Sequence, residues 1–372
     1  MKVTSPLLPP LDAVKRNLDR IWDSEHVTNF GSVHVDLETK ISQYLNAPHT
    51  SLIANGTLAL MGALTAAGVR AGDGGEIITT AYSYAATAQV ILQMGLTPVF
   101  TDVDAGTANL SPREVYKAIT PRTRAILPVH CYGAACDVEG FEALRRETKL
   151  PLVYDASHCF GALHQGRSLA AFGDAASLSF HATKVFNTIE GGAIVCSTPK
   201  IHERAKRWRN FGYAGETNID DVGINAKMSE LHAAVGLANL DIIDAALDHR
   251  HALMKRYQEA LGDVSGLSFL PVGQNAPYCP LMVGDAFPLS RDETYGRLRD
   301  AGITVRRYFY PLITDFAAFK AFAPDPGTLP EATRLAAQVI SLPLHHDLTL
   351  DDVAFVADAL TSWAAPKYHH LK

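Results

Sequence analysis

A lysine and an aspartate stand at the ends of two apolar, strand-like runs, where they could take part in amine chemistry. Lys184 follows Ser179 by five residues and comes just after the apolar run 175–180, and Asp155 ends the preceding run, 152–155. A lysine amine can form a Schiff base with pyridoxal phosphate (PLP), and a carboxylate keeps the pyridine nitrogen protonated so that the ring draws electrons. The sequence around the lysine is apolar and Gly-rich rather than charged. This pair therefore predicts a PLP site rather than an exposed loop.

A glycine and a threonine open a predicted helix directly after a predicted strand. Gly56 and Thr57 follow the strand 49–54 and begin the helix 57–67. The backbone N–H groups and the dipole at such a helix start form a site for phosphate. A plain helix cap is the alternative, because threonine often serves as one.

Short β-branched runs alternate with helical segments between residues 49 and 200. This alternation predicts βαβ units, and hence an α/β fold with a mostly parallel sheet covered by helices. Ligands bind at the carboxyl ends of strands in such sheets, which is where Asp155 lies. The predicted strands span residues 49–54, 76–80, 97–102, 124–129, 152–155, 175–180 and 193–197, and the predicted helices span 57–67, 84–94 and 138–149.

The C-terminal part of the chain has a different pattern. Residues 227–261 form a long, nearly Pro- and Gly-free stretch with helical periodicity, which should lead into a second domain. We expect a large domain over residues 1–250 and a small α+β domain over 251–372. Within the small domain the sequence predicts a strand at 303–305, helices near 291–301 and 351–363, and a frayed tail at 366–372.

Composition and charge exclude several classes of protein. The chain has 372 residues, of which 47% are hydrophobic and 19% charged, as is ordinary for a globular enzyme. A net charge of −6 provides no basic surface for nucleic acid, so an anionic ligand would need local cations. Neither a signal-peptide core nor a run of membrane-spanning length is present, so we expect no membrane partner.

The cysteine pattern predicts reduced thiols and no metal site. The five cysteines are odd in number and scattered through apolar segments, as in a cytoplasmic protein. Cys131, Cys136, His158 and Cys159 lack the paired spacing of zinc ligands.

Several segments, in the same order along the chain, resemble the DegT/DnrJ/StrS family of sugar aminotransferases from about Val27 to Leu360. The resemblance implies a fold-type I PLP-dependent aminotransferase whose large domain has a mostly parallel, seven-stranded sheet. It also implies a homodimer with two active sites, each built by both chains. The segments that carry it are 55–60, 81–88, 98–104, 128–133, 155–158, 179–192 and 223–230.

The resemblance also implies roles for residues around the cofactor. Lys184 would hold PLP and move protons, and Asp155 would contact the pyridine nitrogen. Tyr84 would stack on the ring, although a core aromatic would look the same in sequence. His158 matches the position that contacts the ring oxygen, and Ser179 matches a second phosphate ligand beside the turn at Gly56 and Thr57.

Further residues are implied at the edge of the site. Asn225 matches the residue that family dimers supply to the phosphate of the neighbouring subunit. Lys227 stands where the family usually has arginine, so a bidentate contact cannot be assumed. Arg306, Arg307 and Tyr310 are the remaining candidates for binding substrate, with one of the arginines reaching the pyrophosphate.

The reaction that the resemblance implies is transfer of an amino group from L-glutamate to a keto-sugar carried on a nucleotide. Residues 180–192, 223–230 and 306–311 are most similar to members that aminate C4 of dTDP-4-dehydro-6-deoxyglucose for O-antigen or other surface glycans. Amination at C3, or a UDP- or GDP-linked sugar, stays open.

Two other functions are the alternatives for a chain with this fold. PLP-dependent sugar dehydratases have a histidine in place of the lysine, so the presence of Lys184 disfavours that reaction. A non-catalytic regulator that retains the fold is disfavoured by the presence of Lys184, Asp155 and Ser179 together.

Overall fold

Seven strands form one central sheet in the computed structural model, which describes residues 1–364. Three strands pair in the order β3-β2-β4 and four in the order β1-β9-β8-β5. Parallel bridges from Ile126 to Leu152 and from Val129 to Asp155 join β4 to β5. Only β9 runs antiparallel to its neighbours, so the predicted seven-stranded, mostly parallel sheet is confirmed. The strands are β1 (Thr50–Ile53), β2 (Glu76–Thr80), β3 (Thr97–Thr101), β4 (Thr123–Ile126), β5 (Val153–Asp155), β8 (Ala175–Ser179) and β9 (Gly192–Cys196).

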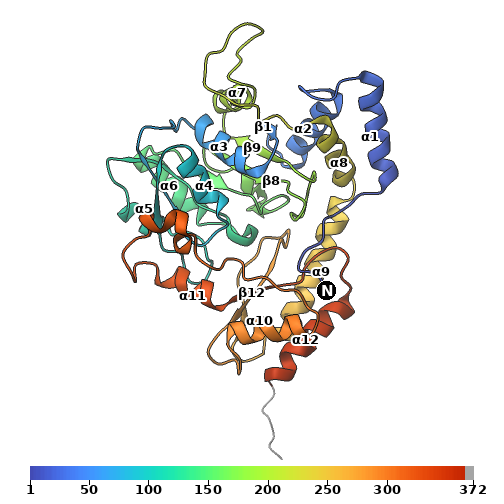
Figure 1. Ribbon diagram of the computed structural model, residues 1–372, viewed down its shortest axis with the longest axis vertical. Helices are drawn as coiled ribbons and strands as arrows, with labels where there is room; N and C mark the ends of the chain where they lie inside the picture. Colours follow the sequence, from blue (N-terminus) through green and yellow to red (C-terminus); the bar gives the residue numbers. More distant parts are fainter. Residues whose placement is uncertain (365–372) are drawn as a thin grey trace, which may run out of the picture.

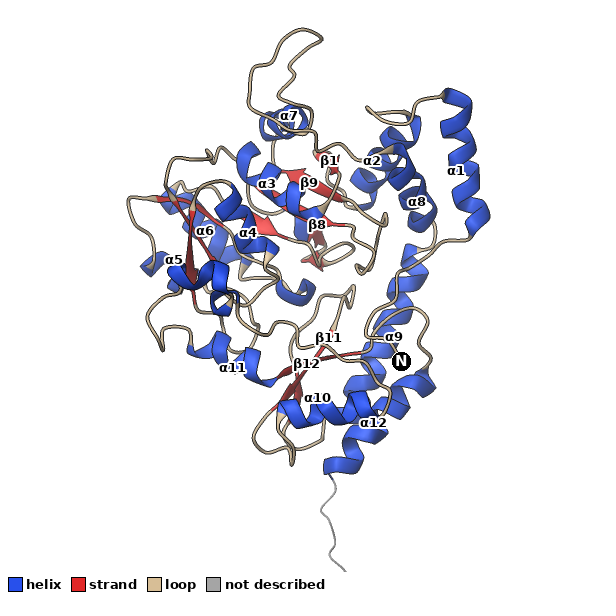
Figure 2. Ribbon diagram, viewed as in Figure 1, coloured by secondary structure: helices blue, strands red, loops and turns tan. Residues whose placement is uncertain are grey.

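Helices surround this sheet, as the colouring in Figure 2 shows. The three helices predicted between the strands are present, with ends that differ from the prediction by at most two residues. Two N-terminal helices were not predicted, and both pack against α8. The helices of this part are α1 (Leu11–Ser24), α2 (Ser32–Tyr44), α3 (Gly56–Ala66), α4 (Ala86–Gln93), α5 (Pro112–Lys117), α6 (Val138–Thr148), α7 (Pro199–Trp208) and α8 (Glu230–Leu240).

The long helical stretch predicted at 227–261 is divided into α8 and α9 (Ile243–Leu261). Ser229 has an extended backbone and its side chain accepts a hydrogen bond from the His232 N–H, so α8 begins only at Glu230. The two helices are separated at Asp241 and Ile242. Helix α9 leads to the second, smaller sheet (Figure 1).

The smaller sheet is antiparallel, in the order β10-β11-β12. The strand predicted at 303–305 is wrong, because only an isolated bridge from Arg306 to Ser341 forms there. Ile303 and Val305 are both fully buried, so their apolar character reflects packing rather than strand pairing. The elements are β10 (Leu267–Phe269), β11 (Cys279–Val283), β12 (Val339–Leu342), α10 (Arg291–Asp300), α11 (Pro330–Gln338) and α12 (Leu350–Ala364).

Short elements complete the described chain. Strands β6 (Leu163–His164) and β7 (Arg167–Ser168) form a two-stranded hairpin, and four 3₁₀ turns span Cys131–Gly133, Leu169–Ala171, Ile313–Asp315 and Ala317–Phe322. All five cysteines are buried and none forms a disulfide. Among residues 1–364, no helix has the length and apolar character needed to cross a membrane. The tail predicted at 366–372 lies outside the described residues.

The apolar core has three parts. Two clusters lie around the large sheet, and a third joins α9, α12 and the smaller sheet. The first residues of the chain lie on the small-sheet side, where the Thr304 N–H donates to the Met1 carbonyl (2.9 Å) and the Leu344 N–H donates to the Val3 carbonyl (3.1 Å). Helix α9 runs across residue 250, and the predicted division of the chain at that residue stays a prediction.

Candidate active site

A small pocket surrounds Lys184 at the carboxyl ends of β5 and β8. Lys184 is half-buried in the turn after β8, where its N–H donates to the carbonyl of His181 (2.8 Å). Three of the predicted site residues therefore meet at one place: Ser179 at the end of β8, Lys184 in the turn that follows, and His158 from the segment after β5. The pocket is lined by Ser157, His158, Phe160, Ser179, Thr183, Lys184, Val185, Pro277 and Tyr278.

Asp155 ends β5 with its carboxylate buried and held on both oxygens. Thr87 Oγ1 donates to Oδ2 (2.8 Å), and the Ser157 N–H donates to Oδ1 (3.1 Å). Because Thr87 donates its proton to Asp155, Ser83 Oγ donates to Thr87 in turn (2.9 Å). Sequence reasoning missed the role of Thr87. The parallel order of β2 and β5 was the available signal, since residues that follow two such strands meet at one sheet edge.

His158 lies between two aromatic rings. Its ring stacks on Phe309 with centroids 6.0 Å apart, and Tyr278 meets it edge-on at 5.0 Å. Burial, and to a lesser extent the charge of Lys184, lower the pKa of His158 well below its usual value, so the ring is neutral at pH 7. Its Nδ1 is buried and has no hydrogen-bond partner among the described residues. That nitrogen is available for a polar group of a bound molecule.

The turn proposed for phosphate packs tightly against the end of β8. Gly56 begins α3, and Asn55 caps this helix by accepting a hydrogen bond from the Leu58 N–H (2.9 Å). A Cβ atom at Gly56 would lie 2.7 Å from the Cβ of Ser179 and 2.8 Å from its Oγ. Only glycine allows this approach. Thr57 is exposed beside it, so the three predicted phosphate residues are together.

Tyr84 lies on the surface between β2 and α4. Its side chain is 66% exposed, so it is not a core aromatic. The carbonyl of Tyr84 accepts a hydrogen bond from the Thr87 N–H (3.1 Å), and Thr87 holds Asp155. The predicted ring-stacking residue is therefore joined through one residue to the predicted pyridine partner.

The segment with Asn225 and Lys227 is bonded beside the phosphate turn. The Ala54 N–H donates to the Ala226 carbonyl (2.8 Å), and Asn225 is exposed. Lys227 Nζ donates to Asn210 Oδ1 (3.1 Å) and lies 4.8 Å from the centre of the Phe211 ring. Lys227 is thus already engaged with neighbours in its own chain, whereas Asn225 presents its side chain to solvent.

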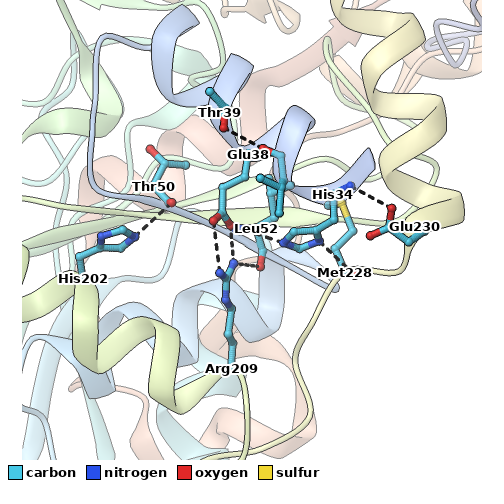
Figure 3. Close-up of polar contacts among 10 residues, drawn as sticks. His34, Glu38, Thr39, Thr50, Leu52, His202, Arg209, Met228 and Glu230 are labelled. Atoms are coloured by element: carbon cyan, nitrogen blue, oxygen red, sulfur yellow. Dashed lines mark hydrogen bonds and ion pairs between the residues drawn. The ribbon is translucent and has the colours of Figure 1, made fainter. Parts of the chain in front are cut away.

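A largely buried ion pair between Arg209 and Glu38 holds the segment with Asn225 and Lys227 in place. Figure 3 shows the Arg209 guanidinium on the Glu38 carboxylate, which also accepts from the Leu52 N–H (2.8 Å). Arg209 donates to the Leu52 carbonyl as well (2.9 Å), while its own carbonyl accepts from the Ala226 N–H (3.0 Å). One residue therefore joins α2, β1 and the segment that carries Asn225. Sequence reasoning identified neither member of the pair.

The charge of Glu38 is favoured by its surroundings. Burial by itself raises the pKa of the Glu38 carboxyl, but His34 and the Arg209 guanidinium outweigh this effect and lower the pKa well below its ordinary value. A second carboxylate acts at the start of α2, where Glu230 accepts from the N–H groups of Val33 (3.0 Å) and His34 (3.1 Å). Both acids are shown in Figure 3.

The predicted substrate residues of the C-terminal part lie elsewhere. Arg307 Nη1 contacts Asp292 Oδ1 (2.8 Å), and its guanidinium lies over the rings of Tyr295 (4.5 Å) and Tyr310 (5.0 Å). Arg306 is exposed. None of Arg306, Arg307 and Tyr310 lines the pocket around Lys184.

Phe309, which lies between Arg307 and Tyr310 in the sequence, does reach the site, although sequence reasoning missed it. Phe309 stacks on His158, and Tyr132 donates its hydroxyl to the carbonyl of Tyr308 just before it. Tyr278, which the sequence also did not single out, forms the other wall. Phe309 lies in the segment 306–311 that the resemblance singled out, although no role was predicted for it, and Tyr278 belongs to no predicted segment.

Comparisons with known proteins match this chain along most of its length. The DegT/DnrJ/EryC1/StrS aminotransferase family model matches residues 12–361. The chain is 43% identical to a dTDP-4-amino-4,6-dideoxy-D-glucose transaminase of Shigella dysenteriae and 36% identical to a protein of the same name from Escherichia coli, each over 96% of this chain and 97% of the relative. The solved structure of DesI in the presence of its TDP-sugar product has a TM-score of 0.91 at 32% identity, covering 98% of this chain and 94% of that one. The matched lengths include both the Lys184 pocket and the segment 306–310.

Proposed function

Because this chain belongs to the DegT/DnrJ/EryC1/StrS aminotransferase family, we propose that it is a PLP-dependent aminotransferase that acts on a nucleotide-linked keto-sugar. The observation that carries the proposal is the meeting of Lys184, Asp155 and His158 at one edge of the sheet. The same placement argues against a non-catalytic regulator, since a regulator has no need of a half-buried lysine beside a neutral histidine.

The residues of the pocket fit PLP. The amine of Lys184 suits its aldehyde, and the Asp155 carboxylate, held by Thr87, suits its pyridine nitrogen. The unpartnered Nδ1 of His158 suits the ring oxygen. Gly56 lets the start of α3 lie directly against Ser179, and the backbone N–H groups at that helix start suit a phosphate group.

The protein's residues handle the protons of the proposed reaction. When bound, PLP supplies an electron sink for the carbon that loses a proton. Lys184 Nζ would remove a proton from the amino donor in the first half-reaction and would deliver a proton to the acceptor carbon of the sugar in the second. Asp155 keeps a proton on the pyridine nitrogen, because a buried carboxylate favours a positive charge beside it. His158 stays neutral and therefore does not add a competing charge.

For the substrates, we propose L-glutamate as donor and C4 of dTDP-4-dehydro-6-deoxy-D-glucose as acceptor. Two relatives with 43% and 36% identity, both named dTDP-4-amino-4,6-dideoxy-D-glucose transaminase, support this choice. The product would serve O-antigen or other surface glycan synthesis. A cytoplasmic location agrees with five buried thiols and no disulfide.

Incubation of the purified protein with glutamate and the dTDP sugar, followed by NMR of the product, tests this proposal. Nitrogen at C4 is the expected result. Nitrogen at C3, or faster turnover of a UDP- or GDP-linked sugar, would reject the acceptor while leaving the aminotransferase assignment intact. No turnover of any keto-sugar would reject the activity itself.

We further propose a homodimer with shared active sites, in which the exposed Asn225 reaches the phosphate site of the partner. Mixing Lys184→Ala with Asn225→Ala subunits tests the sharing. Shared sites give hybrid dimers in which one site carries both lesions and the other carries neither, so activity rises on mixing. Sites built from a single chain leave every site impaired, and mixing then restores nothing.

A further inference from the structure

A strap of six residues, Gly273 to Tyr278, leaves the smaller sheet just before β11 and crosses to the pocket. Its first residue donates an N–H to the carbonyl of Tyr132 (3.1 Å). Asn275 is fully buried, and its Nδ2 donates to the carbonyls of His158 (2.7 Å) and Phe160 (2.9 Å). The strap is therefore fastened to the backbone of the pocket residue His158 itself and of Phe160 just after it.

A buried arginine fastens the other half of the strap. Arg250, on α9, donates from Nε to the Ala276 carbonyl (2.9 Å) and from Nη2 to the Pro277 carbonyl (2.8 Å). Arg250 is 6% exposed, and it takes part in none of the ion pairs described for residues 1–364. Burial lowers its pKa to about 10, which leaves it charged at pH 7. A charge buried without a carboxylate is unfavourable unless hydrogen bonds use its N–H groups, as the two carbonyls of the strap do here.

The strap is bent between these two fastenings. Ala276 has a φ of 40°, in the left-handed region that residues other than glycine rarely adopt. Such a backbone persists only where the surrounding structure holds it, and strained residues of this kind gather at functional sites. Asn275 is the residue before the bend, and its own side-chain hydrogen bonds hold it in place. Arg250 holds the carbonyls of Ala276, at the bend, and of Pro277, after it. Tyr278 follows the bend after Pro277, and the centre of its ring lies 5.0 Å from that of His158.

We propose that Arg250 and Asn275 are positioning residues that hold Tyr278 against His158 and so fix the His158 ring in the Lys184 pocket. The inference deepens the proposed function and rests on it for the meaning of the pocket. The competing explanation is that Arg250 only stabilises the third core cluster, without any effect at His158.

The first experiment needs no cofactor chemistry. Full-length Arg250→Met and Asn275→Ala are compared with wild type by hydrogen–deuterium exchange, both at amides 273–278 and at the C2 position of the His158 imidazole. Arg256→Met is the matched control, because Arg256 is exposed on the same helix. We expect exchange in the strap and at His158 to become at least about tenfold faster in both test variants, with β8 unchanged.

The outcomes of this experiment separate the two explanations. Exchange in the strap and at His158 that stays at the wild-type rate would overturn the inference, as would equal acceleration in Arg256→Met. If Arg250→Met does not fold, Arg250→Lys replaces it, since lysine keeps the charge but cannot donate to both carbonyls in a fixed fork. These readings hold whether or not the wild-type protein transaminates a sugar, so a failure of the proposed function is recognised separately.

The second experiment asks whether Arg250 acts through Tyr278. The kcat for transamination is measured for Arg250→Met, Tyr278→Leu and the double variant, beside the PLP absorbance as a function of pH. If Arg250 works by placing Tyr278, the double variant loses no more than Tyr278→Leu alone, and all three show the same shift of the absorbance titration. Multiplied losses in the double variant, or an unshifted titration in Arg250→Met, would overturn the inference.

Discussion

The two sides of the Lys184 pocket are built in different ways. On the side of the large sheet, Asp155 and Ser179 end the adjacent parallel strands β5 and β8, so strand order alone brings them together. On the other side, Tyr278 and Phe309 come from irregular segments that hydrogen bonds from elsewhere hold in place. Chemistry carried by strand ends is thus fixed by the sheet, whereas the aromatic walls depend on many separate tertiary contacts. Substitutions on the two sides should differ accordingly.

The largest effect is expected on the sheet side, at Lys184. Lys184→Ala should abolish transamination, because no other lysine of residues 1–364 lines the pocket to hold the cofactor and move the proton. Loss of the visible absorbance of bound PLP measures the change. Borohydride reduction followed by peptide mapping is the control, and cofactor fixed to a different lysine would show that the pocket has been wrongly assigned.

The next effect is expected at Asp155. Asp155→Asn should leave PLP bound but lower kcat by about 10²–10⁴-fold, because a neutral amide does not hold the pyridine proton. Thr87→Val, which removes one hydrogen bond to the carboxylate, should give a smaller loss in steady-state turnover. Near-normal turnover in Asp155→Asn would remove this residue from the mechanism.

The Glu38–Arg209 pair, which lies away from the pocket, should affect stability. Glu38→Gln leaves Arg209 buried without its counter-ion and should lower the free energy of unfolding by about 3 kcal/mol at pH 7. The pKa of Glu38 is lowered in the folded protein, so its stabilisation is present above the ordinary value of 4.5 and is lost as the pH falls below it. Urea unfolding at pH 7 and pH 4 should therefore show a difference from wild type that shrinks in acid.

An exposed acid provides the control for that measurement. Glu147→Gln, on the surface of α6, should have the same unfolding midpoint as wild type at both pH values. A Glu38→Gln protein as stable as wild type at pH 7 would mean that the pair contributes no net stabilisation.

The smallest effect separates the two neighbouring arginines. If Arg306 reaches the pyrophosphate, Arg306→Gln should raise KM for the sugar nucleotide about tenfold with little change in kcat. Arg307 is occupied by Asp292, so Arg307→Gln should change the free energy of unfolding by less than about 1 kcal/mol and leave KM nearly unchanged. Initial-rate kinetics give KM for Arg306→Gln and Arg307→Gln, and an equal rise in both variants would contradict the different roles of the two arginines.

The features that were predicted from the sequence lie mainly on the large-sheet side of the pocket, and those that were missed depend on tertiary contacts, as on its aromatic side. The strands of the large sheet were predicted to within a few residues, because alternation of short apolar runs with helices has few structural solutions. Asp155, His158, Ser179 and Lys184 were identified because their positions at strand ends, together with a family resemblance, point to one chemistry. The same resemblance predicted that Gly56 and Ser179 lie together at the phosphate site.

What the sequence did not predict depends on contacts between distant segments. Helix α1 has Ile21 as its one fully buried side chain, and it packs against α8, which lies far along the chain. The run 303–305 has the alternating burial of a strand but pairs with almost nothing. Tyr278 owes its position to Arg250 and Asn275, and no local pattern around any of the three reveals this.

The backbone bonds of Met1 and Val3 to Thr304 and Leu344 bear on how the protein is made. A ribosome releases the N-terminus first, and domains generally begin to fold in that order. Here Met1 and Val3 find their partners only after the segments with Thr304 and Leu344 have been synthesised, and contacts of such long sequence separation form slowly. A ribosome that stalled before residue 344 would leave Val3 without its partner and the third core cluster incomplete.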